Sequence, residues 1–388
     1  MNLAHAEVVS NTPMRNLGIL GRIARVCAVV TAVVVLPVQH AMADADDGKQ
    51  QILPFTTLVE STIPMNGDVN PYGVAFVPNG FPVGGLLNPG DLLVSNFNDA
   101  QNIQGTGTTI IKVAPNGQTS LFFQGNAPLG LSTGLAVLKK GFVLVANCPT
   151  TGGAMPMAEP GSLLVIDSNG RLINTIISPM IQGPWDFTVH DEGNKVKVFV
   201  SNVLTGTVSR LDLVLDGGNV VVKSAALIAS GYLHRTDPAT FEVGPTGSAY
   251  DPHKDILYVA STGDNEVFAI TNAGEENQSR GLGQLIYRDQ VHLHGALAMV
   301  LAPNGHLLVS NSDGINSDPN QPSEIVEFTV HGKFIGQLPV DPAQGGAFGL
   351  NIVQVTDDVV RFAAVDDNAN TITIWKLNTA NLTDPEQH

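Results

Sequence analysis

A strand-rich unit recurs six times along this chain of 388 residues and constrains its fold more than any other feature. Each copy begins with a turn and a short apolar strand. A strongly apolar strand follows, which ends in Asn, Ser or Asp, and a β-branched strand comes third. The copies begin near residues 70, 131, 183, 244, 293 and 346. Because such a unit cannot bury both of its faces alone, its neighbours must cover it. Units made only of strands predict an all-β, six-bladed β-propeller; seven blades or two stacked sandwiches are the alternatives.

The ends of the repeat predict how the ring closes. Segments that could add an outer strand follow units one, two, three and five, at 119–124, 171–177, 219–228 and 333–340. The sixth unit ends after its third strand, whereas residues 52–61 form an orphan strand before the first unit. Pairing that strand with the sixth unit would remove both free edges. We therefore expect one propeller domain over residues 44–388, closed by its own N-terminal strand.

The first 43 residues have the composition of an export signal. Arg15, Arg22 and Arg25 precede an apolar run at 26–38, and the small-x-small triplet 41–43 follows it. The apolar run is too short to span a bilayer comfortably, so cleavage near Ala43 is expected. The sequence therefore predicts a secreted or periplasmic protein without a membrane span after cleavage; an uncleaved anchor is the alternative.

Charge and cysteine content limit the partners. The formal net charge is −16, which argues against a nucleic acid as partner and is compatible with a cationic ligand. Cleavage would remove Cys27 and leave Cys148 alone, so no intrachain disulfide is expected. We expect a monomer that binds a small molecule or a protein at one face of the ring.

Two short motifs carry a resemblance to known propellers. One is the turn Pro71-Tyr72-Gly73-Val74-Ala75, and the other is the apolar strand that ends in Ser-Asn or Ala-Asn. The pattern resembles the NHL-repeat propellers and is similar to the regucalcin, gluconolactonase and strictosidine synthase-like group. Such motifs specify a fold better than an activity. The resemblance to the lactonases implies a hydrolase with a divalent metal, such as calcium, in its channel.

Strand topology places two rings of candidate binding residues at one mouth of the channel. The ring at the turn reads Tyr72, Thr133, Trp185, Thr246, His294 and Phe348, with His294 open to a second register. The second ring, at the ends of the second strands, reads Asn96, Asn147, Asn202, Ser261, Asn311 and Asp366. The aromatic members could stack on a ligand or plug the channel. The Asn and Asp members could bind a hard cation or cap turns of the repeat.

The candidate metal ligands are few. In the lactonases that the chain resembles, Asn and Asp before the turn glycine hold the metal, and here only His294 of that ring could do so. His292 and His294 would share one face of a strand, and His234 could add a third ligand. Asp313 and Asp318 lie in a polar tract of the fifth unit. Surface histidines and an extended loop are the alternative interpretations.

The patterns leave two classes of function open. The first is an exported, non-catalytic propeller that binds a ligand or a protein. The second is a metal-dependent hydrolase or lyase, for which Asp186, Asp366 and the histidines are the candidate acids and bases. Cys148 could be a nucleophile, although an inert buried thiol is the simpler interpretation. The resemblance also implies a channel Glu in strictosidine synthase-like proteins, a position that Glu242 and Glu324 fit poorly.

The export signal gives the first testable prediction. Protein expressed in a host with a secretory pathway should lose residues 1–43, because the triplet 41–43 fits a signal peptidase site. Intact-mass measurement of the purified protein should place its N-terminus at or next to Asp44. A chain that keeps the apolar run 26–38 would contradict the cleaved signal and favour the anchor.

Overall fold

The computed structural model describes residues 58–127, 129–150, 152, 160–237, 240–312, 315, 323–356 and 359–378. The chain divides into two units, residues 1–42 and 43–388, and all the described residues belong to the second. The expected signal segment therefore lies outside the described residues. Within the described part of the chain, no helix has the length and apolar character needed to cross a membrane.

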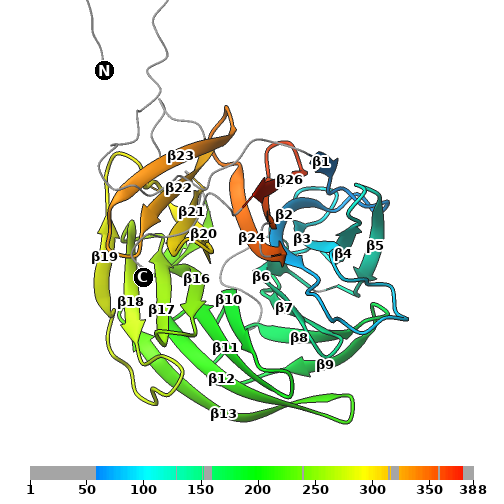
Figure 1. Cartoon of the computed structure of the whole chain (residues 1–388), viewed down its shortest axis with the longest axis horizontal. Helices are drawn as coiled ribbons and strands as arrows, with labels where there is room; N and C mark the ends of the chain where they lie inside the picture. The colour runs from blue at the N-terminus through cyan, green and yellow to red at the C-terminus, as the bar shows by residue number, and fades with distance from the viewer. Residues whose placement is uncertain are drawn as a thin grey trace, which may run out of the picture. The chain divides into compact units, whose positions relative to one another are not determined.

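Six four-stranded antiparallel sheets are arranged in a ring, which makes the fold a six-bladed β-propeller (Figure 1). Each blade begins with the strand nearest the channel. These strands are β2 (Val69–Phe76), β6 (Leu131–Leu138), β10 (Pro184–Asp191), β16 (Pro245–Asp251), β20 (Ala296–Leu301) and β24 (Ala347–Thr356). Each contacts the innermost strands of both neighbouring blades, so these six strands form a closed ring around the channel.

The second and third strands continue each blade outward. The second strands are β3 (Leu92–Asn98), β7 (Phe142–Asn147), β11 (Lys195–Asn202), β17 (Ile256–Ser261), β21 (His306–Asn311) and β25 (Val359–Asp366). The third strands are β4 (Thr109–Val113), β8 (Ser162–Asp167), β12 (Thr207–Asp216), β18 (Glu266–Thr271), β22 (Ser323–Thr329) and β26 (Thr371–Asn378). Most of their side chains are buried, because other blades cover both faces of each sheet.

The outer strands show how the two ends of the domain meet. Five are β5 (Thr119–Gln124), β9 (Leu172–Ile176), β13 (Asn219–Ser230), β19 (Gln284–Arg288) and β23 (Phe334–Asp341). The sixth is β1 (Leu58–Ser61), which pairs antiparallel with β26 from Leu58–Ile374 to Ser61–Thr371. The described part of the expected closing strand therefore lies where the unfinished sixth repeat predicts it. Residues 52–57 are outside the described residues.

The hydrophobic core is divided among the interfaces between blades. A separate apolar cluster fills each of the six interfaces. The cluster between blades six and one joins Val94 and Ile111 to Val365 and Ile372, which lie 254 to 278 positions away in the sequence. Since each side chain in these clusters removes apolar surface from water, the ring is stabilised by contacts between blades as well as within them.

The innermost strands have a bulge at the start of every blade, and it explains the turn glycine of the repeat. The register shifts between Pro71 and Val74 in blade one, and each other blade has an equivalent shift. A Cβ at Gly349 would collide with the carbonyl oxygen of Tyr72 in the next blade, and one at Gly247 would lie 2.5 Å from the Met299 nitrogen. The glycines thus permit neighbouring backbones to approach closely around the channel.

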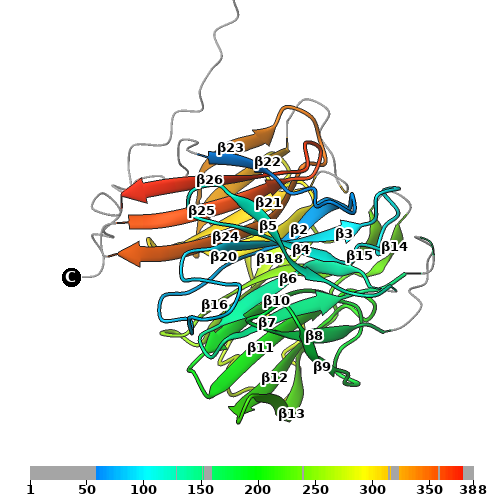
Figure 2. The ribbon, with the colours of Figure 1, turned by 90° about the vertical axis from the view of Figure 1, so that its right-hand side faces the viewer.

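An insertion between blades three and four adds a short hairpin to one end of the ring. Strand β14 (Arg235–Asp237) pairs with β15 (Phe241–Val243) in a two-stranded sheet of its own. The hairpin precedes β16, so it lies on the side of the ring where the innermost strands begin. Figure 2 shows it at the right, the side from which β24 starts. We call this side of the ring the mouth.

The close approach at Gly349 can be tested by adding one methyl group. Gly349→Ala should lower the free energy of unfolding by ~3 kcal/mol, because the backbone of Tyr72 cannot move without opening the ring. Gly80→Ala is the control: its φ of +80° costs about 1 kcal/mol, and no atom lies within 4 Å of the added Cβ. Urea denaturation measures both variants. Equal losses of unfolding free energy in the two variants would show that the close approach at Gly349 does not contribute to stability.

Candidate functional site

A layer of aromatic side chains closes the mouth of the channel. Tyr72 and Trp185 come from the turns of blades one and three, and Phe348 comes from blade six. The ring centroid of Tyr72 lies 4.6 Å from that of Phe348 and 5.8 Å from that of Trp185, and Phe97 lies 4.9 Å from Tyr72. Offset and edge-to-face contacts of this kind hold aromatic rings firmly in place. The layer therefore lies between the interior of the channel and the mouth of the ring.

The inserted hairpin adds Phe241 to this layer by means of a strained turn. The Phe241 backbone has φ +69°, and Glu242 N–H donates to the Thr240 carbonyl oxygen at 2.8 Å. A three-residue turn with positive φ is rare for a bulky residue and costs energy. It buries the Phe241 ring against Phe97 and Trp185, with centroids 6.3 Å apart in each pair. It also brings Glu242, the next residue, to the mouth.

A cavity of about 180 Å³ lies on the mouth side of the aromatic layer, and we call it the mouth pocket. Its walls combine aromatic rings, small polar side chains and two carboxyl groups. The lining residues are Asn70, Tyr72, Gln104, Trp185, Thr240, Glu242, Thr246, Thr262, Leu297, Ser312, Gly345, Phe348 and Asp367. Apolar walls with a few convergent polar groups are typical of sites for small ligands.

The two carboxyl groups of the mouth pocket have raised pKa values. Burial, with a smaller contribution from the charge of Asp237, raises the pKa of Glu242 to about 7. Burial, followed by the charge of Asp366, raises the pKa of Asp367 to about 7. The charge of Asp367 also adds to burial in raising the pKa of Tyr72, which indicates that these two groups are near each other. The pocket thus contains two acids that change charge near neutral pH.

Three buried oxygen atoms in the wall of the mouth pocket lack a hydrogen-bond partner. They are Asn70 Oδ1, Thr240 Oγ1 and Glu242 Oε2. The Glu242 side chain belongs to a residue only 6% exposed, and Asn70 is 8% exposed. Most buried polar atoms in proteins are hydrogen-bonded, because an unpaired one costs about 1–3 kcal/mol. A cluster of unpaired acceptors is therefore a place where a bound molecule could donate hydrogen bonds.

A second cavity of about 230 Å³ occupies the channel behind the aromatic layer. Its lining residues follow the aromatic layer in each strand, as Asp186 follows Trp185 and Gly349 follows Phe348. Asp186 takes the place that glycine has in four other blades, and its Oδ1 accepts a hydrogen bond from Phe187 N–H at 2.7 Å. Burial raises the pKa of this carboxyl to about 7. Asp186, a candidate acid from the sequence, thus lies behind the layer and outside the mouth pocket.

The structure brings four members of the expected turn ring together at the mouth and places His294 elsewhere. Tyr72, Trp185, Thr246 and Phe348 all line the mouth pocket, as the repeat predicts; the Thr133 side chain lies outside the described residues. In blade five the bulge falls between Ala296 and Met299, so Leu297 and not His294 is the ring member. The repeat pattern favours Gly295 as the turn glycine of this blade, whereas the structure has Ala298 in that place.

The second ring of Asn residues tightens loops and does not line the pocket. Asn147 Oδ1 accepts from Gly130 N–H at 3.0 Å, Asn202 Oδ1 from Gln182 N–H at 2.9 Å, and Asn311 Oδ1 from His294 N–H at 3.0 Å. In each case the end of the second strand is bound to the loop that enters the same blade. Asn96 likewise donates to the Thr62 carbonyl at 3.1 Å. These contacts support the structural interpretation of the ring over ligand binding.

Asp366, the acidic member of the second ring, stands just behind a pocket residue. Its Oδ1 accepts from Ala369 N–H at 3.1 Å, and burial and the charge of Asp341 raise its pKa to about 6. It does not line the mouth pocket, but the neighbouring Asp367 does. The repeat thus predicts an acid one residue before Asp367, the carboxyl that lines the pocket.

The two candidate histidines each have a partner within the protein. Residues 290–294 are not in a strand: His292 Nδ1 pairs with Asp289 Oδ2 at 2.6 Å, and the ring stacks on Phe334. His294 Nε2 contacts the Val291 carbonyl oxygen at 3.0 Å. Asp313 and Asp318, the other candidate ligands, lie outside the described residues. Among the residues the structure does describe, no three His, Cys, Asp or Glu side chains are grouped as a metal site.

The side chains of the turn ring fit a calcium ion poorly. Calcium is bound by six to eight oxygen ligands. At the turn ring, where the resemblance places the metal ligands, the described side chains are mainly aromatic or aliphatic. The residues here do not match the metal site that the lactonase resemblance implies.

Cys148 has the properties of an inert thiol. It is fully buried, its Sγ lies 2.9 Å from the Pro184 carbonyl oxygen, and burial strongly raises its pKa. A thiol held in its protonated form is a poor nucleophile. The simpler interpretation from the sequence is therefore supported.

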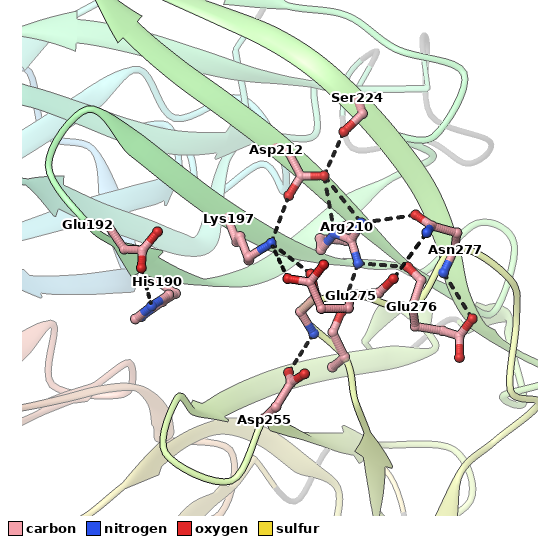
Figure 3. A network of polar contacts seen from close by, with 12 residues as sticks. His190, Glu192, Lys197, Arg210, Asp212, Ser224, Asp255, Glu275, Glu276 and Asn277 are labelled. Atoms are coloured by element: carbon pink, nitrogen blue, oxygen red, sulfur yellow. Dashed lines mark hydrogen bonds and ion pairs between the residues drawn. The ribbon is translucent and has the colours of Figure 1, made fainter.

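A charged cluster between blades three and four is satisfied by its own pairs (Figure 3). Lys197 Nζ pairs with Asp212 and with Glu275 at 3.4 Å each and donates to the Gly274 carbonyl at 2.7 Å. Arg210 donates to Asp212 and to the carbonyl oxygens of Ala273 and Glu276. These contacts join blades three and four, and an open cavity of about 560 Å³ lies beside Lys197, Asp212 and Glu275.

Comparison with known proteins identifies the fold. No protein-family model and no curated protein matches the sequence. Among solved structures, a gluconolactonase from Xanthomonas campestris is similar, with 13% identity, a TM-score of 0.51 and coverage of 84% of this chain and 97% of that one. The chain shares the fold of this gluconolactonase.

Two other structures are similar at lower TM-scores. A putative glucose dehydrogenase from Thermus thermophilus has a TM-score of 0.49 and 13% identity, with 82% of this chain and 99% of that chain covered. A calcium-binding regucalcin from Agrobacterium tumefaciens has the same TM-score and identity, with 82% and 94% covered.

The buried carboxyl of Asp186 predicts how stability depends on pH. Its pKa is about 7 in the folded protein and near 4 in the unfolded chain, so the folded state binds the extra proton between these values. The stability that the protonated Asp186 contributes is fully present below pH 4 and is lost as the pH rises through 7. Asp186→Asn should therefore raise the free energy of unfolding at pH 8, by at most ~4 kcal/mol, and change it little at pH 4.

The control has the opposite sign. Hydrogen bonds and the Arg171 charge lower the pKa of Asp167, so Asp167→Asn should reduce stability at pH 8. Urea denaturation of both variants at pH 4 and pH 8 makes the comparison. If Asp186→Asn is less stable than the wild-type protein at pH 8, the ionised carboxylate is favourable in its buried position and the prediction is wrong.

Proposed function

We propose that this chain binds a small organic molecule in the mouth pocket. The observation that carries the proposal is the buried, unpaired Glu242 Oε2 in the wall of a cavity lined by Tyr72, Trp185 and Phe348. The predicted export signal would place this binding outside the cytoplasm.

The concave shape favours a small ligand over a protein partner. The mouth pocket, at about 180 Å³, is smaller than the ~300–1,000 Å³ of a site for a drug-sized molecule. A ligand of modest size could pack on the aromatic rings and donate to the unpaired oxygens. Strain in the turn at Phe241 supports the same conclusion, because strained backbone often positions functional groups.

Filling the mouth pocket should abolish binding without changing the fold. Gln104 lines the pocket from a surface loop, so Gln104→Phe should occupy it from the rim. Gln101→Phe, three residues away on an exposed position that does not line the pocket, is the matched control. Small molecules that raise the melting temperature of the wild-type protein should do so for Gln101→Phe and not for Gln104→Phe. Equal stabilisation of both variants would place the ligand elsewhere.

Hydrolysis of a lactone is the second candidate, and the two acids of the mouth pocket favour it. A carboxyl group with a pKa of about 7 is well suited to accept a proton from water near neutral pH. The water oxygen would then bond to the lactone carbonyl carbon, and the ring C–O bond would break as the leaving oxygen takes up a proton. The gluconolactonase with the same fold makes gluconolactone the first substrate to test.

The hydrolase candidate predicts a pH profile and a residue. If Glu242 is the base, activity on gluconolactone should rise with pH through about 7 as the carboxyl ionises. Glu242→Gln should lower kcat by ~100-fold or more, since general acid–base catalysis contributes about 10²–10⁴. This mechanism uses no metal, because the turn ring is mainly aromatic or aliphatic, so EDTA should leave the rate unchanged. Activity that survives in Glu242→Gln, or that requires added calcium, would contradict this mechanism.

A further inference from the structure

We infer that the ligand of the mouth pocket is a small organic cation that carries N–H donors on an apolar body. This inference rests on the proposed binding function and names the chemical class of its ligand. Three independent properties of the pocket lead to it: the sign of its charges, the kind of hydrogen-bonding atom it leaves unpaired, and its aromatic walls.

The charged groups that line the mouth pocket are all acidic. Glu242 and Asp367 line the pocket, and no Lys, Arg or His is among its described lining residues. The charged groups behind the lining are Asp366 and Asp341 on the blade-six side and the hairpin pair Arg235–Asp237, whose atoms are 3.2 Å apart. Arg235 is already neutralised by its partner. Among the charged groups of the lining an anion would therefore meet only carboxylates, whereas a cation would relieve their repulsion.

The unpaired atoms require donors from the ligand. Asn70 Oδ1 is an acceptor and cannot donate, and the same is true of Glu242 Oε2 when the carboxyl is ionised. Thr240 Oγ1 can accept a hydrogen bond as well. An ammonium group has three N–H donors and no acceptor, and a guanidinium has five. Either group matches such a wall, whereas a carboxylate or phosphate would bring further acceptors. Hydrogen bonds between an ionised donor and an ionised acceptor are also stronger than neutral ones.

The aromatic walls suit the same class of ligand. Cations are attracted to the faces of Trp, Tyr and Phe rings, and an apolar chain gains by packing on them. Trp185 is 2% exposed and Tyr72 is 7% exposed, so contact with a ligand would occur in a largely dehydrated site. Attraction between a cation and an aromatic ring is greatest where water is excluded.

The pH dependence of binding follows from the same carboxyl groups. Both have pKa values raised to about 7 in the free protein, mainly by burial. A bound cation favours their ionised forms, so binding must release protons below about pH 7. The affinity for a cation should therefore increase between pH 5 and pH 8, whereas that for a neutral molecule should not.

Matched probes test the inference on the full chain. n-Butylammonium, 1-butanol and n-butyrate have similar apolar bodies but are positive, neutral and negative at pH 8. Calorimetric titration should give n-butylammonium about tenfold higher affinity than 1-butanol, with no binding of n-butyrate. The preference should fall severalfold at pH 5. Trp375→Phe leaves Trp185 as the only tryptophan, so a change in its fluorescence on titration locates the cation in the pocket.

Variants separate the carboxyl from general surface charge. Glu242→Gln should remove most of the preference for n-butylammonium over 1-butanol, and Asp367→Asn should reduce it. Glu192→Gln, which removes an exposed carboxyl outside the pocket, should leave it unchanged. Melting curves confirm that each variant is folded.

The outcomes distinguish this inference from the proposed function. If 1-butanol binds as tightly as n-butylammonium and alters Trp185 fluorescence, the pocket binds ligands but the cation inference is wrong. If n-butylammonium binds without changing Trp185 fluorescence, or equally well in Glu242→Gln, the inference is also wrong, because the cation is held by another acidic surface. If none of the three probes binds, both proposals are overturned.

Discussion

The close approach of six innermost strands around one channel is the constraint on which the rest of this structure depends. At Gly349 and Gly247 the neighbouring backbone leaves no room for a Cβ. A ring packed this closely fixes where each turn begins, and so it fixes which side chains reach the mouth. The blades that depart from glycine matter most: Asp186 introduces a buried acid, and Ala298 shifts the fifth ring position to Leu297. The positions of both cavities follow from this crowding.

The hairpin inserted between blades three and four turns the end of a closed channel into a pocket. The ring alone would present Tyr72, Trp185 and Phe348 as an apolar plug. The hairpin adds Phe241 to the plug and puts Glu242 beside it, at the cost of a left-handed backbone at Phe241. Blade six adds Asp367 at the end of its second strand. The acids thus come from parts of the chain that are outside the apolar repeat, while the rings come from the repeat itself.

The sequence predicts the fold well because the repeat is a packing pattern. The order of strands, four of the outer strands and the aromatic members of the mouth all follow from the spacing of apolar residues and turns. The outer strand β19 is less apolar and has no comparable signal. Glu242 fits no repeat position, since it belongs to the insertion, and Asp367 lies one residue beyond the expected Asp366. The position of His294 does not follow from the repeat, because Gly295 is a stronger turn signal than Ala298. Asn147 and Asn202 of the second ring hydrogen-bond to the loops that enter their own blades.

The central claim is that the mouth pocket holds a ligand between the aromatic layer and the two carboxyl groups. A crystal structure of the protein soaked at pH 8 with n-butylammonium tests it most directly. We expect electron density for the ligand against Trp185 and Phe348, with its nitrogen within hydrogen-bond distance of Glu242 Oε2. Density confined to the channel cavity beside Asp186 or to the charged cluster around Lys197, or a mouth pocket that contains only ordered water, would contradict the account.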